Sequence, residues 1–105
     1  MNLEIKKDLA SNWFRILQNA FCDDIIKLEK NKLKFKSTVW KRSNNKDEGG
    51  GEFRLLQNGK IFEKVGVNFS KVYGKFPKQF QKNILGAEKN PNFWASGISV
   101  VMHMK

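Results

Sequence analysis

The chain has 105 residues, 40% of them hydrophobic and 29% charged, which suits one folded domain or part of one and excludes a disordered chain. Lys and Arg outnumber Asp and Glu by 20 to 10. The resulting charge favours an anionic partner, although a solvated lysine-rich surface explains it equally well. The single cysteine, Cys22, excludes a disulfide framework and a thiolate metal cluster. With a charged N-terminus and no apolar stretch of membrane-spanning length, we expect a cytoplasmic protein.

The first expected element is an amphipathic helix over residues 3–30. Its hydrophobic residues recur at spacings of three and four, which predicts one face packed against a core. We expect Trp13 and Phe21 to lie in that core, and Cys22 to be a small core residue of the same helix. The predicted packed face consists of Ile5, Leu9, Trp13, Ile16, Leu17, Ala20, Phe21, Ile25 and Leu28.

Residues 33–40 alternate and predict a strand, with Leu33, Phe35 and Val39 on a buried face and lysines on a wet face. The polar residues 43–48 predict a loop. The glycine run 49–51 is followed by a strand pattern rather than by a helix, so we exclude a phosphate-binding loop. These glycines instead predict positive φ or a close backbone approach.

Asn58-Gly59 is the strongest hairpin signal in the chain, because a type I′ turn needs positive φ at both central positions. With this turn, Gln57 faces Lys60, and the next three pairs outward are Leu56 with Ile61, Leu55 with Phe62 and Arg54 with Glu63. Leu55 and Phe62 would point to one side, and Leu56 and Ile61 to the other. Both faces of the hairpin would then need cover, which predicts an α+β fold with an antiparallel sheet flanked by helices.

The second half of the chain continues this sheet. We expect Val65, Val67 and Phe69 to follow Ile61 on one face, with Gly66 and Asn68 on the other, where small side chains leave space. The strand should end near residues 72–74. A short helix over 78–85, a turn at 90–91 and a strand over 97–104 follow.

In that last strand Ser99, Val101 and His103 are two residues apart and share a face. A hydroxyl and an imidazole on one side of a sheet can both form hydrogen bonds to a ligand. A lone histidine is more often structural than functional. One histidine also cannot make a metal site by itself, because about three protein ligands are needed.

Taken together, these motifs resemble the N-terminal signature of the oxygen-dependent coproporphyrinogen III oxidases. The long run from Phe62 to Ser70 makes the resemblance specific, and it extends more loosely over the whole chain. The family often has a proline after the histidine, where this chain has Met104. The matching positions are Trp40, Arg42, Gly49, Gly50, Gly51, Leu56, Gly59, Phe62, Glu63, Lys64, Gly66, Val67, Asn68, Ser70, Gly97, Ser99 and His103.

The resemblance implies a large flat antiparallel sheet between helices, with residues 1–105 as the N-terminal portion of a single truncated domain. It implies oxidative decarboxylation of coproporphyrinogen III to protoporphyrinogen IX in haem biosynthesis, with O₂ as co-substrate and no organic cofactor. Ser99 would contact the substrate, and His103 would lie by the active site and, in some members, bind a divalent metal.

The resemblance also implies a homodimer, and it places part of the dimer interface in the hairpin. Because the later active-site residues of the family are missing from these 105 residues, we expect the chain alone to be inactive. The implied interface residues are Arg54, Leu55, Leu56, Gln57, Asn58, Gly59, Lys60, Ile61, Phe62 and Glu63.

The alternative from a different class is a small basic α+β module that binds RNA or another anionic partner. It would explain the net charge of +10 but not the run from Phe62 to Ser70. It predicts an affinity that falls steeply with salt concentration. The lysines are scattered singly among apolar residues, which argues against nucleic acid as the partner.

Overall fold

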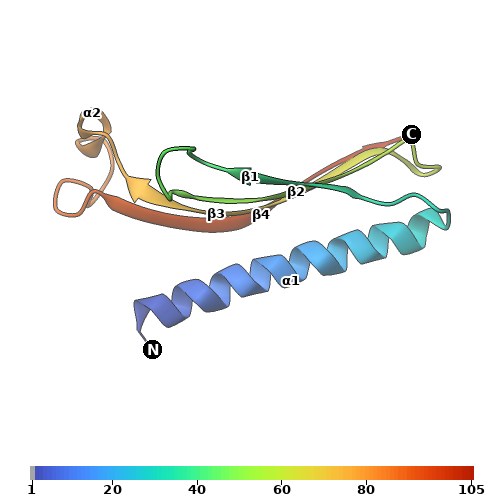
Figure 1. Cartoon of the computed structure of the whole chain (residues 1–105), viewed down its shortest axis with the longest axis horizontal. Coiled ribbons are helices and arrows are strands. Elements are labelled where there is room, and N and C mark those ends of the chain that lie inside the picture. The colour runs from blue at the N-terminus through green and yellow to red at the C-terminus, as the bar shows by residue number, and fades with distance from the viewer. Residues whose placement is uncertain (1) are drawn as a thin grey trace.

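One long helix lies along one face of a four-stranded antiparallel sheet in the computed structural model, which describes residues 2–105 (Figure 1). The strand order is β1-β2-β3-β4, so each strand pairs with its neighbour in the chain. The sequence prediction of an α+β fold with an antiparallel sheet is therefore confirmed. The elements are α1 (Leu3–Glu29), β1 (Lys36–Lys41), β2 (Gly49–Gln57), β3 (Phe62–Lys75), α2 (Lys78–Gln81) and β4 (Asn92–Met104).

The helix α1 begins and ends close to where the sequence predicts. Asn2 caps its N-terminus by accepting a hydrogen bond from the Ile5 N–H at 2.9 Å. Lys30 ends it in the left-handed conformation with φ of 53°, and its own N–H donates to the Ile26 carbonyl. No helix within residues 2–105 is long and apolar enough to cross a membrane.

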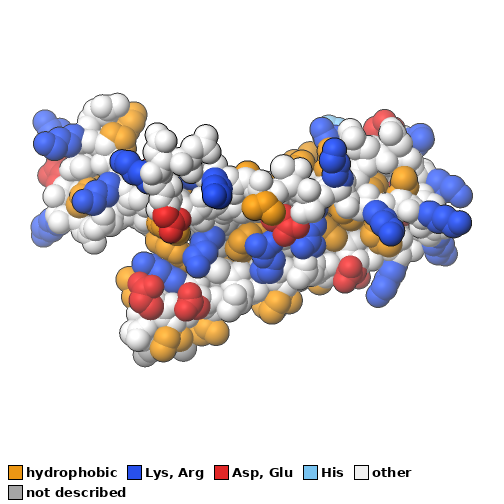
Figure 2. Space-filling model, viewed as in Figure 1, with side chains coloured by type: hydrophobic (Ala, Val, Ile, Leu, Met, Phe, Trp, Pro, Cys, Tyr) orange, Lys and Arg blue, Asp and Glu red, His pale blue; other side chains and the backbone are white. Residues whose placement is uncertain are grey.

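The predicted buried face of α1 is wrong over most of its length. Trp13 is 56% exposed, and hydrophobic side chains line the outer side of α1, away from the sheet (Figure 2). The side of the helix that meets the sheet instead mixes polar and apolar residues. Among the polar ones, Gln18 donates to carbonyls of the sheet and Glu29 accepts from N–H groups of the hairpin. The exposed members of the predicted face are Ile5, Leu9, Trp13, Ile16, Ala20 and Leu28, and the buried helix residues are Ser11, Gln18, Cys22, Ile25 and Glu29.

The apolar core lies between the C-terminal half of α1 and the sheet. It confirms the prediction for Cys22, which is 5% exposed, and Phe21 packs against it as a partly buried residue. Burial raises the pKa of the Cys22 thiol, so it stays a neutral core side chain. The cluster consists of Cys22, Ile25, Leu56, Phe62, Val65 and Val67.

The predicted register of the hairpin between β2 and β3 is wrong by four residues. Leu56 pairs with Val65, and Arg54 pairs with Val67. The chain reverses at residues 60–61, and Asn58 donates from its N–H to the carbonyl of Glu63 at 2.9 Å. Asn58 does have the predicted positive φ, 61°, but Gly59 does not. As a result Leu55 faces away from α1 while Phe62 is in the core.

Glu29 explains the shifted turn. This last residue of α1 is 2% exposed, and its carboxylate accepts hydrogen bonds from the N–H groups of Lys60, Ile61 and Phe62 at 2.7–3.2 Å. A Cβ on Gly59 would lie 2.3 Å from a Glu29 carboxylate oxygen, so glycine is needed there for close approach rather than for a turn. A contact from about 30 residues away thus overrides the local turn signal.

The remaining elements differ from prediction mainly at their ends. β4 begins at Asn92, five residues before the predicted start, and α2 stops at Gln81, four residues before the predicted end. Gly49 has the predicted positive φ of 85°. Val39 lies on the predicted face of β1, yet it is 77% exposed because α1 does not extend over this edge strand.

Candidate functional site

The sheet has two different faces, and side chains alternate between them along each strand. The face toward α1, called the helix face, carries Glu52, Arg54, Leu56, Val65, Val67 and Phe69. The opposite face, called the open face, has no long helix over it (Figure 1). By register the open face carries Thr38, Trp40, Phe53, Leu55, Gly66, Asn68, Ser70, Ser99, Val101 and His103.

Ser99 and His103 do share a face, as the sequence predicts. Ser99 pairs with Asn68 and His103 pairs with Lys64, so both point to the open face, and both are exposed. Between them Val101 is 52% exposed. The structure therefore places a hydroxyl and an imidazole on one accessible strip of β4, at the edge of the sheet.

Trp40 and Asn68 form a polar link across the same face. The Trp40 indole N–H donates to the Asn68 side-chain oxygen at 2.9 Å, and both residues are partly buried. The indole ring crosses β2 at Gly51, where a Cβ would lie 2.8 Å from a ring carbon. A Cβ on Gly51 would also collide with the backbone carbonyl oxygen of Phe69, which is nearer still, so a side chain is excluded first by the neighbouring strand β3 and then by the Trp40 ring.

Sequence reasoning treated Asn68 only as a small side chain, and it missed this contact. A signal was available, because asparagine is depleted in strand interiors and Asn68 lies in the apolar run from Val65 to Phe69. By register it also falls directly opposite Ser99. A polar residue at this position predicts a partner, either within the chain or in a ligand.

Two aromatic contacts border this polar link. Phe53 packs over Gly66, where a Cβ would lie 3.1 Å from two carbons of the Phe53 ring. Toward the other end of the sheet, the Arg42 guanidinium lies 4.6 Å from the centre of the Phe93 ring and donates to the Tyr73 carbonyl at 3.0 Å. The open face thus carries aromatic side chains and, at one end, the positively charged side chain of Arg42.

The helix face is polar too, but its groups are already satisfied by one another. Gln18 is fully buried, and its amide donates to the carbonyls of Glu52 at 2.8 Å and Val67 at 3.2 Å. Glu52 accepts from Arg54 at 2.9 Å and from Arg15 at 2.5 Å. Hydrogen bonds from Arg54 and Ser37 lower the pKa of Glu52 to about 2. This network holds α1 on the sheet and is structural.

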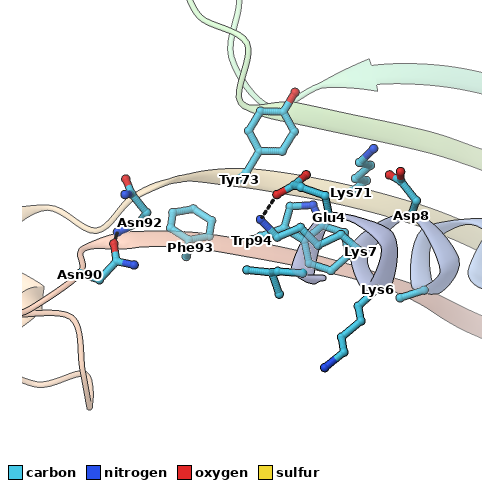
Figure 3. Close-up of a pocket in the computed structure, with 12 residues that line it drawn as sticks. Glu4, Lys6, Lys7, Asp8, Lys71, Tyr73, Asn90, Asn92, Phe93 and Trp94 are labelled. Atoms are coloured by element: carbon cyan, nitrogen blue, oxygen red, sulfur yellow. Dashed lines mark hydrogen bonds and ion pairs between the residues drawn. The ribbon is translucent and has the colours of Figure 1, made fainter. Parts of the chain in front are cut away.

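A cleft lies where the N-terminal half of α1 leaves the sheet (Figure 3). It measures about 800 Å³, and Trp94 and Tyr73 form part of its lining. Its charges are mixed, because three lysines face Glu4 and Asp8, and Glu4 already pairs with Lys7 at 3.3 Å. Neither Ser99 nor His103 lines it, so the cleft and the predicted site are separate. Its lining lysines are Lys6, Lys7 and Lys71.

A metal site at His103 finds little support in the described part of the chain. Residues 2–105 contain no group of three or more His, Cys, Asp or Glu side chains that could hold a metal ion. The cross-strand neighbour of His103 is Lys64, whose positive charge disfavours a bound cation.

The residues expected at a dimer interface divide into two groups. Leu56, Gly59 and Phe62 are buried within this chain and cannot contact a partner directly. Arg54 is partly buried against Glu52. Leu55 is partly exposed on the open face, and the exposed members are Gln57, Asn58, Lys60, Ile61 and Glu63, which surround the tip of the hairpin.

Comparison with known proteins gives one consistent result. A family model described as Coproporphyrinogen III oxidase matches residues 10–105. The chain is 42% identical, over 113 aligned positions, to the oxygen-dependent coproporphyrinogen-III oxidases of Rickettsia typhi and Rickettsia prowazekii, covering 100% of this chain and 39% of each relative. It is 41% identical to the protein of the same name from Rickettsia felis, covering 94% of this chain and 37% of that relative. The chain therefore spans well under half the length of these curated relatives.

Proposed function

The chain belongs to the oxygen-dependent coproporphyrinogen III oxidase family, and from this membership we propose that it forms one wall of an enzyme that oxidatively decarboxylates coproporphyrinogen III. In each of two steps, one propionate side chain and one O₂ give a vinyl group, CO₂ and hydrogen peroxide. The product is protoporphyrinogen IX, so the place of the protein is in haem biosynthesis. Because the chain spans only 39% of the length of its relatives, we assign the reaction to the longer protein of this family.

The observation that carries this proposal is the open face. An open sheet face with Ser99 and His103 on one accessible strip suits a macrocycle that carries carboxylates and pyrrole N–H groups. In this arrangement Ser99 hydrogen-bonds a propionate, and His103 lies over the same substrate. The net charge of +10 attracts a ligand with four carboxylates.

The proposal includes O₂ as co-substrate and no organic cofactor. A divalent metal at His103 would take its other ligands from outside residues 2–105, since the described chain offers no cluster for it. What this chain contributes is positioning of the substrate on the open face.

We also propose a homodimer in the cytoplasm, without nucleic acid as a partner. The exposed tip of the hairpin, with Ile61 at 36% exposure next to Lys60 and Glu63, offers a mixed surface of the kind that protein interfaces use. A single free, buried cysteine, Cys22, suits a reducing compartment. The RNA-binding alternative gains no observation from the structure.

The experiment is an oxidase assay on the protein at the length that its reading frame encodes. We expect coproporphyrinogen III and O₂ to give protoporphyrinogen IX, measured as fluorescent protoporphyrin after oxidation. Ser99→Ala and His103→Ala should lower turnover by about tenfold or more while the melting temperature changes by about 2 °C or less, because both side chains are exposed.

Thr38→Ala is the matched control, because Thr38 lies in the same row as Ser99 but on the edge strand β1. It removes an exposed hydroxyl from the same face and should leave turnover unchanged. Unchanged kinetics in both Ser99→Ala and His103→Ala would overturn the site assignment. Absence of product from the wild-type protein would overturn the proposed reaction.

A further inference from the structure

We propose that Asn68 is a further substrate-binding residue, which holds a carboxylate of the ligand beside Ser99, and that Trp40 is the residue that positions it. This inference rests on the proposed function and adds a donor and a ligand group to the same site. It starts from the hydrogen bond of 2.9 Å between the Trp40 indole nitrogen and the Asn68 side-chain oxygen.

This bond fixes the orientation of the Asn68 amide. An indole N–H can only donate, so the amide must turn its oxygen toward Trp40. The amide nitrogen then lies on the side away from Trp40 and β1. Within residues 2–105 that nitrogen donates to no protein acceptor, and it is not a buried unsatisfied atom, so it is open to solvent. Its two N–H donors are therefore oriented and accessible to a ligand.

These donors lie next to Ser99. Asn68 and Ser99 are direct cross-strand partners on the open face, and side chains of such pairs lie about 5 Å apart at Cβ. Nothing in the described chain lies within 4 Å of a Cβ placed on Gly97, two residues before Ser99 on the same face. The amide and the hydroxyl thus border an uncovered part of the sheet.

The Asn68 amide and the Ser99 hydroxyl together determine which chemical group of the ligand can bind between them. A pyrrole N–H is itself a donor and cannot pair with the amide nitrogen, whereas a carboxylate has two acceptor oxygens. One oxygen can accept from the Asn68 amide and the other from the Ser99 hydroxyl. The pair therefore suits a propionate of a macrocyclic polycarboxylate, and it fixes which edge of the macrocycle lies over β3 and β4.

Trp40 acts through Asn68 rather than on the ligand. Its ring occupies the space above Gly51, so the indole nitrogen is held in one position across β2. Without the indole donor the Asn68 amide could rotate and present its oxygen to the ligand. That rotation would place an acceptor against a carboxylate and weaken binding.

The test uses the protein at the length that its reading frame encodes, ¹⁵N-labelled at asparagine side chains and titrated with coproporphyrin III, the stable oxidised tetracarboxylate. Work at about 0.3 M salt suppresses the general attraction of a basic protein for an anion. We expect the Asn68 side-chain NH₂ signals to shift on binding. Asn68→Asp keeps the acceptor for Trp40 and should weaken binding by about tenfold, because a carboxylate then faces a carboxylate.

Asn19→Asp is the matched control, since it makes the same charge change at an exposed position of α1 and should alter affinity by less than about twofold. Trp40→Phe should weaken binding by about threefold in the wild-type background but not in the Asn68→Asp background, because Trp40 acts through the Asn68 amide. The shift of the Asn68 NH₂ signals on binding is measured on the wild-type protein, so it tests the role of Asn68 even if a variant fails to fold.

The outcomes separate this inference from the proposed function. If the wild-type chain binds the porphyrin and Ser99→Ala weakens it, while Asn68→Asp equals Asn19→Asp and the NH₂ signals stay fixed, the role of Asn68 is overturned and the proposed function stands. If the wild-type protein binds no coproporphyrin III, the role of Asn68 is overturned, and the oxidase assay decides the proposed function separately.

Discussion

The two faces of the sheet use polar residues in opposite ways. On the helix face, Gln18, Glu29 and Glu52 are satisfied by partners within the chain, and the network closes α1 onto the strands. On the open face, Ser99 and His103 are exposed, and the Asn68 amide nitrogen donates to no acceptor within residues 2–105. Polar groups of the helix face therefore stabilise the fold, and the accessible polar groups of the open face are those for which we propose a role in binding.

Neighbouring leucines of β2 give the sharpest test of this difference. Leu56 is 1% exposed on the helix face, so Leu56→Ala should cost about 3 kcal/mol of unfolding free energy through lost burial and a cavity. Leu55→Ala, on the open face and partly exposed, should cost about 1 kcal/mol. Urea unfolding followed by circular dichroism measures both. Equal losses would contradict the assignment of the two faces.

The contact between Glu29 and the hairpin should give the next largest effect. Glu29→Gln replaces a carboxylate that accepts from three backbone N–H groups by an amide with one acceptor oxygen. We expect the melting temperature to fall by roughly 8 °C. Glu88→Gln changes the same group at an exposed position and should have almost no effect. If both variants melt alike, the carboxylate does not hold the loop.

The pH dependence of stability tests the helix face from another direction. Hydrogen bonds from Arg54 and Ser37 lower the pKa of Glu52 from 4.5 to about 2. The Glu52 carboxyl binds a proton more readily in the unfolded chain than in the folded one. The stability that ionised Glu52 gives the fold is therefore fully present above about pH 4.5 and is lost as the pH falls toward 2.

The expected loss for Glu52 is about 1 kcal/mol between about pH 6 and pH 3, once screening of a partly exposed ion pair is allowed for. Desolvation raises the pKa of Glu29, but hydrogen bonds from the N–H groups of Phe62, Ile61 and Lys60 outweigh it, so the pKa is lowered overall. Glu29 therefore adds to the loss of stability at low pH. Glu52→Gln should flatten the curve of urea midpoint against pH. An unchanged slope would show that Glu52 does not carry this dependence.

The smallest effect is expected on the outer side of α1. Trp13 is 56% exposed, so Trp13→Gln should change the free energy of unfolding by less than about 0.5 kcal/mol. Ile25 is 4% exposed on the helix side that meets the sheet, and Ile25→Gln should cost several times more. A large loss from Trp13→Gln would mean that this side of the helix is covered in solution, for example by a second copy of the chain.

Much of the fold and part of the site could be predicted from local pattern. Alternation of side chains placed Val67 and Asn68 on opposite faces, and the same rule put Ser99 and His103 on one strip. The face of α1 and the turn of the hairpin could not be predicted this way. Hydrophobic spacing does not show that Gln18 finds two carbonyl acceptors on the sheet, which are 34 and 49 residues away in sequence.

The family, the helix, the four strands and the shared face of Ser99 and His103 all follow from the amino-acid sequence alone, because motif identity and the fixed periods of helix and strand specify them. Tertiary contacts set which side of α1 meets the sheet, where the hairpin turns, and how Trp40 orients the Asn68 amide. Each of those depends on a hydrogen bond between residues at least 28 positions apart, whose partners meet only once the strands have paired.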